Sequence, residues 1–382
     1  MIHRIKNMAR MALVVSLIGL SAVSEAATGG FSSGTGSTAT AVTVTTLTEL
    51  KNAFNNGNHH IIVSGTIYGG ATLTTLTFAS TSWNNTTIEG ASGGQAILEN
   101  IQLKFSGETL ATGTNIENIV VKNITFRGRI ADLQALPKQV YGTSNNVGIN
   151  YLGVSLRRVS NAWIDHCTFY DISDDLMSVS LSSDNVTLSY NHFYFTAAWR
   201  DMNPDPVWNW VGTDSDLAGE RLAMVIGANK SDSYTYGGNK LRVTMHHNWF
   251  GPNMRGRPLI RGWVHAYNNY FDNTGQPSGT ITATNGTAYS KQQYNAFQIG
   301  SGSVIYSEYN YYYLTNNSNQ LGLDSSGDSY SFFEKSGTNT YNGVTGTKIT
   351  GAAFTGSPVG AYTYTADTTN IPSIVQANAG PK

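Results

Sequence analysis

The sequence predicts an all-β fold in which short parallel strands wind into a solenoid, a parallel β-helix. The first observation is a succession of short β-type segments with few helical periodicities between them. The second is an Asn-x-aromatic triplet that recurs along the chain. The third is the composition. Charged residues make up only 12% of the 382 residues, and there are 40 Gly and 21 Tyr, which favours strands and turns over charge-rich helices.

The predicted elements begin after a Gly/Ser/Thr-rich leader at 27–41. A short strand and a helix-like stretch follow within 42–54, where apolar residues have a helical spacing. The later segments are rich in β-branched or aliphatic residues, and we expect each of them to be a strand. They are 61–63, 87–88, 96–98, 119–121, 154–156, 179–181, 224–226, 243–245 and 297–299.

The recurring triplets set the period of the solenoid. They lie at 191–193, 248–250, 269–271 and 310–312, with a looser version at 166–169. Successive aromatic residues are separated by 24, 57, 21 and 41 positions. The short spacings match one coil, and the long ones fit two coils or one coil with an inserted loop. The candidate loops are 195–219 and 272–294, which are polar and rich in turn residues.

The asparagine of each triplet has a predicted place at a corner of the coil. Asparagine tolerates left-handed backbone geometry, and its amide can bond to the asparagine of the next coil. The alternative fold is a large antiparallel sandwich or barrel. That fold would need Asn-Gly or Asp-Gly hairpin turns at regular intervals, and few are present.

The two ends of the chain differ from the repeats. Residues 1–26 have a basic start, an apolar run and a small-x-small cleavage site near Ala26, which predicts a secretory signal peptide. We therefore expect export and a single β-helix domain over 27–382. Within it, the segment 335–382 carries no motif and is expected to cap the last coil or pack along the solenoid. The only cysteine, Cys167, cannot form an internal disulfide.

Charge and hydropathy exclude several partners. The net charge is −1 without a basic stripe, which argues against nucleic-acid binding. No apolar run beyond the predicted signal peptide is long enough to anchor the protein in a membrane. We expect a monomer.

Three ordered blocks carry a family resemblance. They are AWIDHC at 162–167, NVTLSYNHF at 185–193, and RVTMHHNWFGPN at 242–253, which continues into RGRPLIRGWVHAYNN at 255–269. In this order they resemble the pectate lyase family, also called polysaccharide lyase family 1, which includes the pectin lyases. The resemblance covers about 28–315. It implies a right-handed, single-stranded parallel β-helix whose loop insertions form a cleft.

The resemblance also implies a reaction. The family cleaves α-1,4-linked polygalacturonate by β-elimination, with an arginine as the base that removes the proton from C5. Counting forward from Phe250 places this arginine at Arg257, and counting backward from His265 places it at Arg255. We favour Arg257 because this choice keeps Pro258 and the second arginine, Arg261, in the pattern. Arg261 would then hold a substrate carboxylate through two hydrogen bonds.

The calcium site that many pectate lyases possess is incomplete in this sequence. Of the expected aspartates only Asp174 matches, with Asp175 beside it, whereas Leu152 and Ser178 occupy two other aspartate positions. Hard oxygen ligands suit Ca²⁺, and leucine offers none. The lysine that the family places before its M-L-x-G segment is Leu222 here, and the adjacent Arg221 would point the other way on a strand.

Three interpretations remain open. The first is a calcium-free pectin lyase, whose substrate is already neutralised by methyl esters. Aromatic and basic residues would bind that substrate, and the candidates are Trp199, Trp208, Trp210, Arg157, Arg158 and Arg200. The second is a carbohydrate-binding solenoid without catalysis. The third is a polygalacturonase-type hydrolase with Asp174 and Asp175 as its paired carboxylates, although the other motifs of that family are absent.

Overall fold

The structure, a computed structural model, describes residues 28–32, 34–147, 151–256, 258–274, 279–290, 295–315, 317–321, 329–345 and 348–382. The predicted signal peptide at 1–26 lies outside these residues.

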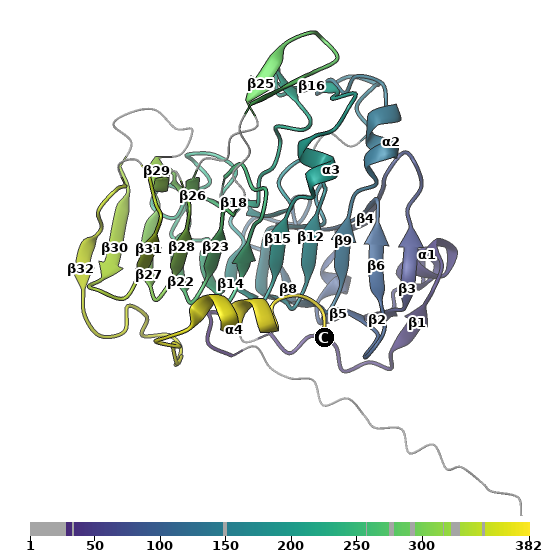
Figure 1. Cartoon of the computed structure of the whole chain (residues 1–382). Coiled ribbons are helices and arrows are strands. Elements are labelled where there is room, and N and C mark those ends of the chain that lie inside the picture. Colours follow the sequence, from purple (N-terminus) through teal and green to yellow (C-terminus); the bar gives the residue numbers. More distant parts are fainter. Residues whose placement is uncertain are drawn as a thin grey trace, which may run out of the picture.

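Three parallel sheets form the body of the molecule, and the predicted parallel β-helix is confirmed (Figure 1). Sheet 1 has eleven strands: β1 (Val42–Val44), β2 (His60–Val63), β5 (Thr86–Gly90), β8 (Ile116–Lys122), β11 (Val159–Asp165), β14 (Asp184–Ser189), β19 (Arg242–His246), β22 (Trp263–Tyr267), β27 (Val304–Glu308), β30 (Ser331–Lys335) and β32 (Ala352–Phe354).

Sheets 2 and 3 complete each coil. Sheet 2 has nine strands: β3 (Gly65–Tyr68), β6 (Ala96–Glu99), β9 (Thr125–Arg127), β12 (Thr168–Tyr170), β15 (His192–Tyr194), β20 (Trp249–Phe250), β23 (Tyr270–Asp272), β28 (Tyr311–Tyr313) and β31 (Thr340–Asn342). Sheet 3 has eight strands: β4 (Thr74–Phe78), β7 (Ile101–Ser106), β10 (Val154–Arg157), β13 (Met177–Ser180), β18 (Met224–Ile226), β21 (Leu259–Ile260), β26 (Asn295–Ile299) and β29 (Asn317–Leu321).

The chain visits the sheets in the order 1, 2, 3 and then begins the next coil. Strands β15 and β20 are direct neighbours, as are β23 and β28. The long spacings of 57 and 41 residues are therefore single coils with inserted loops, one of the two expectations. The inserts contain two antiparallel hairpins, β16 (Val207–Trp210) with β17 (Thr213–Asp216), and β24 (Thr280–Thr282) with β25 (Ala288–Ser290).

The interior of the solenoid is filled by alternate residues of every strand, because successive side chains of a strand point to opposite faces. Equivalent aromatic residues lie one above another along sheet 2. Phe169 stacks on Phe193 with ring centroids 5.1 Å apart, and Phe193 stacks on Phe250 at 5.1 Å. Such stacks bury large apolar surfaces in every coil, so each coil depends on its neighbours for its core.

The predicted asparagine ladder is present inside the turns from sheet 1 to sheet 2. The side-chain amide of Asn191 donates to Oδ1 of Asn248 at 3.0 Å, and Asn248 donates to Asn269 at 3.0 Å. The expectation of left-handed geometry at these asparagines is wrong by one residue. The positive φ angles belong to the preceding residues, such as Tyr190 (52°) and His247 (56°), because the chain must turn before the amide can point inward.

Short helices lie at the ends and loops of the solenoid. They are α1 (Leu47–Asn55), the 3₁₀ helix η1 (Thr81–Trp83), α2 (Ile130–Ala135), α3 (Ala197–Arg200) and α4 (Ile371–Asn378). The predicted helix within 42–54 corresponds to α1, which begins with a capping box between Thr46 and Glu49. No helix among the described residues is long and apolar enough to span a membrane.

The N-terminal end of the described chain runs across the outer face of sheet 1, whereas the C-terminal segment crosses sheet 1 near Tyr362 and Tyr364 before α4 (Ile371–Asn378) packs against sheet 2. Near the N-terminus, the backbone N–H groups of Phe31 and Ser32 donate to the hydroxyl groups of Thr244 and Thr187. The C-terminal segment first extends the solenoid with β30, β31 and β32 and then runs back along it (Figure 1). The N–H of Gly380 donates to the carbonyl of Tyr190. The segment that lacked a motif thus both ends the coil stack and packs along it.

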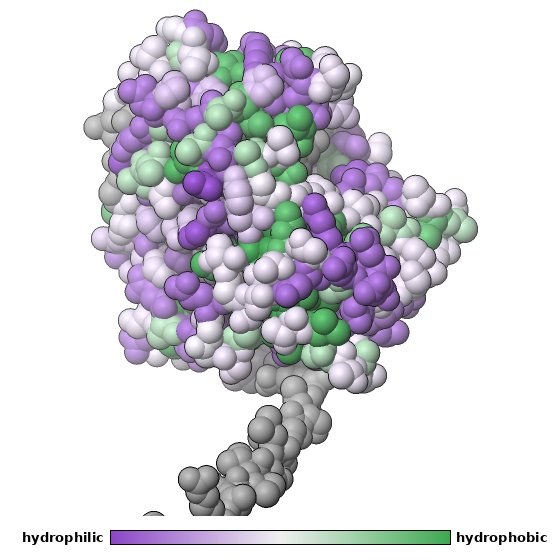
Figure 2. Space-filling model, turned by 90° about the vertical axis from the view of Figure 1, so that its right-hand side faces the viewer, coloured by the Kyte–Doolittle hydropathy of each residue, from purple (hydrophilic) through white to green (hydrophobic). Residues whose placement is uncertain are grey.

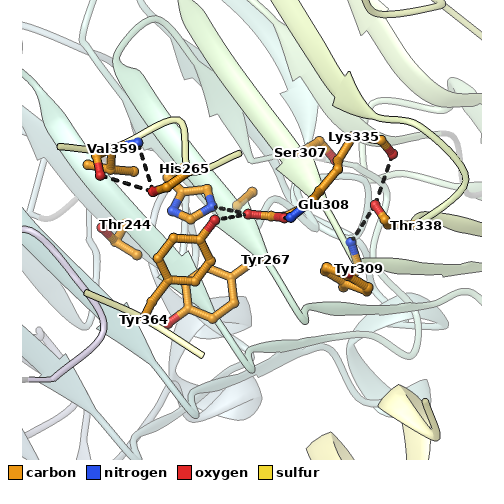
Figure 3. A network of polar contacts seen from close by, with 12 residues as sticks. Thr244, His265, Tyr267, Ser307, Glu308, Tyr309, Lys335, Thr338, Val359 and Tyr364 are labelled. Carbon is orange, nitrogen blue, oxygen red and sulfur yellow. Dashed lines mark hydrogen bonds and ion pairs between the residues drawn. The ribbon is translucent and has the colours of Figure 1, made fainter. Parts of the chain in front are cut away.

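A buried polar network attaches this returning segment to sheet 1 (Figure 3). Nε2 of His265 lies 2.9 Å from Oε1 of Glu308, which also accepts a hydrogen bond from the hydroxyl of Tyr364. The ammonium of Lys335 lies 2.8 Å from the other carboxylate oxygen. Burial lowers the pKa of His265. These contacts satisfy both oxygens of a carboxylate that is completely buried.

Candidate active-site groove

The insertions that carry α2, α3 and the two hairpins lie at the same junction, between sheet 2 and sheet 3. They project from one side of the solenoid (Figure 1). Backbone bridges join Val140 to Asn209 and Asp205 to Ala283, so the insertions pack against one another. We call their described parts, 128–147, 195–223 and 279–290, the loop wall. Seen from the end where β1 lies, the surface is hollowed between these loops and the body of the molecule (Figure 2).

The outer face of sheet 3 runs beneath the loop wall. Val154 and Leu156 of β10 point into the core, so Ser155 between them points outward. Its neighbours in register are Lys104 of β7 and Ser178 of β13. The hydroxyl oxygens of Ser155 and Ser178 lie 3.0 Å apart, and both residues are buried. The centre of this floor is therefore a polar hydroxyl pair, with the charged Lys104 beside it on β7.

The register of β10 on β13 corrects the position that the sequence assigned to Leu152. The resemblance placed Leu152 at the position of one calcium-binding aspartate and Ser178 at the position of another. Leu152 lies before β10, whereas Ser155 stands beside Ser178. Counting residues from Trp163 did not reveal this, because the spacing along the chain does not give the register between neighbouring strands.

The residues at this position do not fit a calcium site. Asp174 is half-buried and Asp175 is buried in the turn from β12 to β13. Among the residues that the structure describes, no group of three or more His, Cys, Asp or Glu side chains could hold a metal ion. Calcium takes six to eight oxygen ligands, mostly carboxylates and carbonyls. The hydroxyl pair of Ser155 and Ser178 supplies no charge, so we derive no step through a metal here.

Arg261 lies in the next outward row of sheet 3, directly after β21. In this row its neighbours are Gly227 and Gly300, which lack side chains. A Cβ atom added at Gly300 would lie 2.7 Å from Cγ of Arg261, and one at Gly227 would lie 2.9 Å from its Cβ. Nη1 of Arg261 donates to the carbonyl of Gly227 at 2.7 Å. The two glycines form a slot that holds this side chain, which is only 5% exposed.

Arg255 lies in the turn from β20 to β21, below the loop wall. Its N–H donates to the carbonyl of Arg221 at 2.8 Å, and its Nη1 donates to the carbonyl of Gly219 at 3.1 Å. The leading sequence candidate for the base, Arg257, lies outside the described residues. The structure therefore places two of the three predicted arginines, Arg255 and Arg261, on the turns that flank β21.

Arg221 is a further arginine of this region, and only 1% of it is exposed. Its Nε donates to the carbonyl of Asn253 at 2.9 Å, and its Nη1 donates to the carbonyl of Ala218 at 2.6 Å. Burial, and then the charge of Arg255, lower the pKa of Arg221 to about 10. Its guanidinium does not replace the missing lysine at Leu222, because it is enclosed within the loop wall.

Two buried carboxylates accompany these arginines, and sequence reasoning did not select them. Asp205 accepts a hydrogen bond from the N–H of Ala218 at 2.8 Å, while its second oxygen has no hydrogen-bond partner. Asp216 also has one buried oxygen without such a partner. Burial raises the pKa of Asp205 to about 7, and the N–H of Ala218 and the charge of Asp216 modify it further. Nothing in the local sequence distinguishes these aspartates from surface aspartates of a loop.

Arg200, at the end of α3, takes part in the same cluster. Its guanidinium forms a fork with the carboxylate of Asp201 and donates through Nη1 to Oδ1 of Asn253 at 3.0 Å. The hydrogen bonds that Arg200 donates to Asp201 raise the pKa of Arg200. Arg200 lies in the loop wall, where its charge is already paired with Asp201.

The expected aromatic contacts with substrate are wrong for two of the three tryptophans. Trp199 and Trp208 are 0% exposed and belong to the hydrophobic core below the loop wall. A completely buried ring cannot stack on a sugar, so these residues anchor the loop. Trp210 is half-buried, with its ring centroid 5.8 Å from that of Trp208, and it remains a candidate.

Arg158 also differs from its expected role. It lies in the turn from sheet 3 to sheet 1, on the opposite edge of sheet 3 from the loop wall. Its guanidinium donates to backbone carbonyls of the 108–114 loop, including Leu110 and Thr114. The preceding Arg157 forms a two-bond ion pair with Glu108 and lowers the pKa of that carboxyl to about 2. Both charges therefore stabilise a loop.

Comparisons with known proteins point to one family. A model of the family described as pectate lyase matches residues 213–382, which include Arg221, Arg255 and Arg261. This part of the chain is similar to the pectate lyase family. The chain is 26% identical over 245 residues to a pectate lyase of Bacillus subtilis, covering 59% of this chain. It is 34% identical over 122 residues to pectate lyase 1 of Juniperus ashei, covering 31% of this chain.

The likeness to solved structures extends over almost the whole chain. A pectate lyase from Acidovorax avenae subsp citrulli has a TM-score of 0.59 at 17% identity, covering 97% of this chain and 99% of that chain. At this identity the likeness is one of fold. The matched segments span 47% of the Bacillus relative and 26% of the Juniperus relative.

Proposed function

We propose that the protein is a lyase that cleaves α-1,4-linked galacturonan, as pectate or pectin, by β-elimination. The observation that carries the proposal is the pair Arg255 and Arg261, which flank β21 beside the outer face of sheet 3 in a chain similar to the pectate lyase family. A pectic chain would lie in the hollow between sheet 3 and the loop wall. Its carboxyl groups, free or esterified, need positive charge where an enolate develops.

The proposed reaction is an elimination across the C4–C5 bond. An arginine removes the proton from C5, which the neighbouring carboxyl group acidifies. The electrons of the C5–H bond form a double bond between C4 and C5. The bond between C4 and the glycosidic oxygen breaks, and this oxygen leaves with the electron pair and takes up a proton. Arg257 remains our leading candidate for the base, with Arg255 as the alternative and Arg261 as the carboxylate clamp.

The cationic surroundings support an arginine base. An isolated guanidinium stays protonated in proteins and cannot accept a proton. Here burial and the neighbouring charge of Arg255 lower the pKa of Arg221 to about 10. Burial and a neighbouring cation thus make the guanidinium of Arg221 easier to deprotonate than an isolated one.

The floor of the groove supports a substrate that carries less charge. Ser178 occupies one position where the resemblance implies a calcium-binding aspartate, and its neighbour in register is Ser155. These hydroxyls cannot balance a divalent cation. A methyl-esterified chain needs no such cation, because its carboxyl groups are already neutral. We therefore propose a modest preference for methylated pectin and activity without added calcium.

The experiment measures the unsaturated product by its ultraviolet absorbance. Purified protein is mixed with polygalacturonate or with highly methylated pectin, each with calcium or with chelator. We expect absorbance to rise on methylated pectin and to persist with chelator. New reducing ends without absorbance would indicate hydrolysis, and absence of product in every arm would favour a carbohydrate-binding protein. Arg257→Lys should abolish turnover and leave binding nearly intact.

We also propose that the protein is exported and acts as a monomer. Export follows from the signal-peptide pattern at 1–26, in which a basic start precedes an apolar run. Cleavage near Ala26 would be detected by N-terminal sequencing of the protein recovered from the medium. The oligomeric state would be measured by light scattering of the purified protein.

A further inference from the structure

The turn that carries Arg255 has little secondary structure of its own. It connects β20 (Trp249–Phe250) to β21 (Leu259–Ile260), and each of these strands has only two residues. Ladder hydrogen bonds of such short strands cannot fix the whole connection. We call residues 253–256 the arginine segment. Its geometry must come from contacts outside sheets 2 and 3.

Those contacts come mainly from the end of the neighbouring loop. The carbonyl of Arg221 accepts from the N–H of Arg255 at 2.8 Å, and the guanidinium of Arg221 donates to the carbonyl of Asn253 at 2.9 Å. A parallel bridge joins Leu222 to Gly256. Arg221 thus binds the arginine segment at two points, once through its backbone and once through its side chain.

The conformation of Asn253 shows why the hydrogen bond from the guanidinium of Arg221 matters. Asn253 has a left-handed backbone, with φ of 62°, which costs energy for a residue with a side chain. Its amide donates to the carbonyl of Phe195 at 2.9 Å and accepts from Arg200 at 3.0 Å. Together with Arg221, these bonds occupy the backbone carbonyl and both side-chain polar atoms of Asn253. The turn is therefore held in one conformation by the loop wall.

The burial of Arg221 needs an explanation. A buried guanidinium is unfavourable unless its hydrogen bonds and its charge are satisfied. Here two of its bonds go to the backbone carbonyls of Ala218 and Asn253, and the nearby carboxylate of Asp216 compensates its charge. An apolar side chain would fill the same volume at lower cost, but it would leave the carbonyl of Asn253 without this donor.

We propose that Arg221 is a positioning residue, whose buried guanidinium fixes the arginine segment and so sets the place of Arg255 in the groove. The inference rests on the proposed lyase function for its catalytic consequence. The fixing of the segment itself is independent of that function. Arg221 does not touch the substrate, because the loop wall encloses it.

Two variants and a control test the proposal. Arg221→Ala removes the guanidinium and leaves a cavity, and Arg221→Lys keeps the charge but loses the planar fork. Arg242→Ala is the matched control. It breaks the ion pair between Arg242, at the start of β19 in sheet 1, and the buried carboxylate of Asp184, whereas the arginine segment follows β20 of sheet 2. It should therefore lower stability without changing the groove.

The first readout is hydrogen exchange of peptides that cover 253–256. We expect exchange at least about 10-fold faster in Arg221→Ala, an intermediate rate in Arg221→Lys, and wild-type rates in Arg242→Ala. Wild-type exchange in Arg221→Ala would overturn the proposal. Hydrogen exchange can be measured even if the wild-type protein forms no unsaturated product. A failure of the proposed lyase function is therefore distinguished from a failure of the positioning role of Arg221.

The second readout is turnover on the best pectic substrate. We expect kcat to fall about 10- to 100-fold in Arg221→Ala, with KM changed less than about threefold, because misplacement of a group affects the transition state more than binding. Millimolar guanidinium ion should restore part of kcat by filling the cavity. If the loss matches that of Arg242→Ala, or if guanidinium restores nothing while exchange is unchanged, Arg221 only stabilises the fold.

Discussion

The hydroxyl oxygens of Ser155 and Ser178 lie 3.0 Å apart on neighbouring strands β10 and β13, at the centre of the outer face of sheet 3. Both side chains are buried and hydrogen-bonded to each other. In a parallel sheet, residues in register lie about 4.8 Å apart along the solenoid. Two carboxylates at these positions would repel unless a cation lay between them. The hydroxyl pair does not need a cation between the two strands. Substitution of these two residues can therefore test what makes such a site depend on calcium.

The double variant Ser155→Asp with Ser178→Asp should acquire calcium-dependent stability. Without calcium, the two carboxylates repel and the variant should unfold at a lower temperature than the wild-type protein. Calcium bound to the folded state raises stability by about 2.7 kcal/mol at 100 times its Kd. Thermal unfolding with calcium and with chelator measures the difference. The wild-type protein is the control, and its stabilisation by calcium would contradict the interpretation of the floor.

Gly300→Ala should impair catalysis without removing a charge. The new methyl group would lie 2.7 Å from Cγ of Arg261 and would displace that side chain from its slot. We expect kcat/KM on the preferred pectic substrate to fall at least about 10-fold. The matched control is Gly94→Ala, where the nearest atom is 3.8 Å away. Equal activity of the two variants would show that Arg261 is not held by this slot.

Glu308→Gln should loosen the C-terminal segment from sheet 1. The variant keeps the volume of the side chain but removes the charge that pairs with Lys335 and accepts from His265 and Tyr364. Breaking a buried ion pair costs about 3–5 kcal/mol. Limited proteolysis followed by mass spectrometry should show faster cleavage between 355 and 382. The exposed Glu117 provides the control variant Glu117→Gln, which should be cleaved at the wild-type rate.

Asp205→Asn should change how stability depends on pH. The folded pKa of Asp205 is raised to about 7 by burial, whereas the unfolded value is about 3.9. Between these values the folded protein binds the extra proton, so this group lowers stability as pH rises from about 4 to about 7.

The variant lacks this titration. It should match the wild-type protein near pH 4 and exceed its stability by about 1–4 kcal/mol near pH 8. Denaturant unfolding at both pH values measures the difference. Asp214→Asn, on the exposed part of β17, is the control. A constant difference between Asp205→Asn and the wild-type protein across this pH range would show that Asp205 is already ionised at pH 4.

Sequence reasoning located the arginines but did not recognise their support. Arg255 and Arg261 were selected because motifs around Pro258 carry them. Arg221 was noted as a neighbour of Leu222, and Asp205 and Asp216 were not noted at all. Their importance depends on burial between loops that are far apart in the sequence. No local pattern reports that Arg221 donates to the carbonyl of Asn253, 32 positions later.

The sequence alone determined the architecture of this protein. Alternating apolar residues and the asparagine triplets repeat with the length of one coil, and each repeat can bury its apolar face only against the next one. The asparagines of successive coils were therefore expected to bond to each other, and Asn191 and Asn248 do so. The same local regularity predicted the strand at 154–156 and the loop at 195–219.

Only the tertiary structure decided which outward residues meet. The register of β10 on β13 places Ser155, and not Leu152, beside Ser178. The packing of the loop wall buries Trp199 completely and directs Arg221 toward Asn253. The physical reason is that inserted loops vary in length and have no repeat. The contacts between loops depend on how the coils stack in three dimensions. A pattern along the sequence does not report which residues of different loops lie close together.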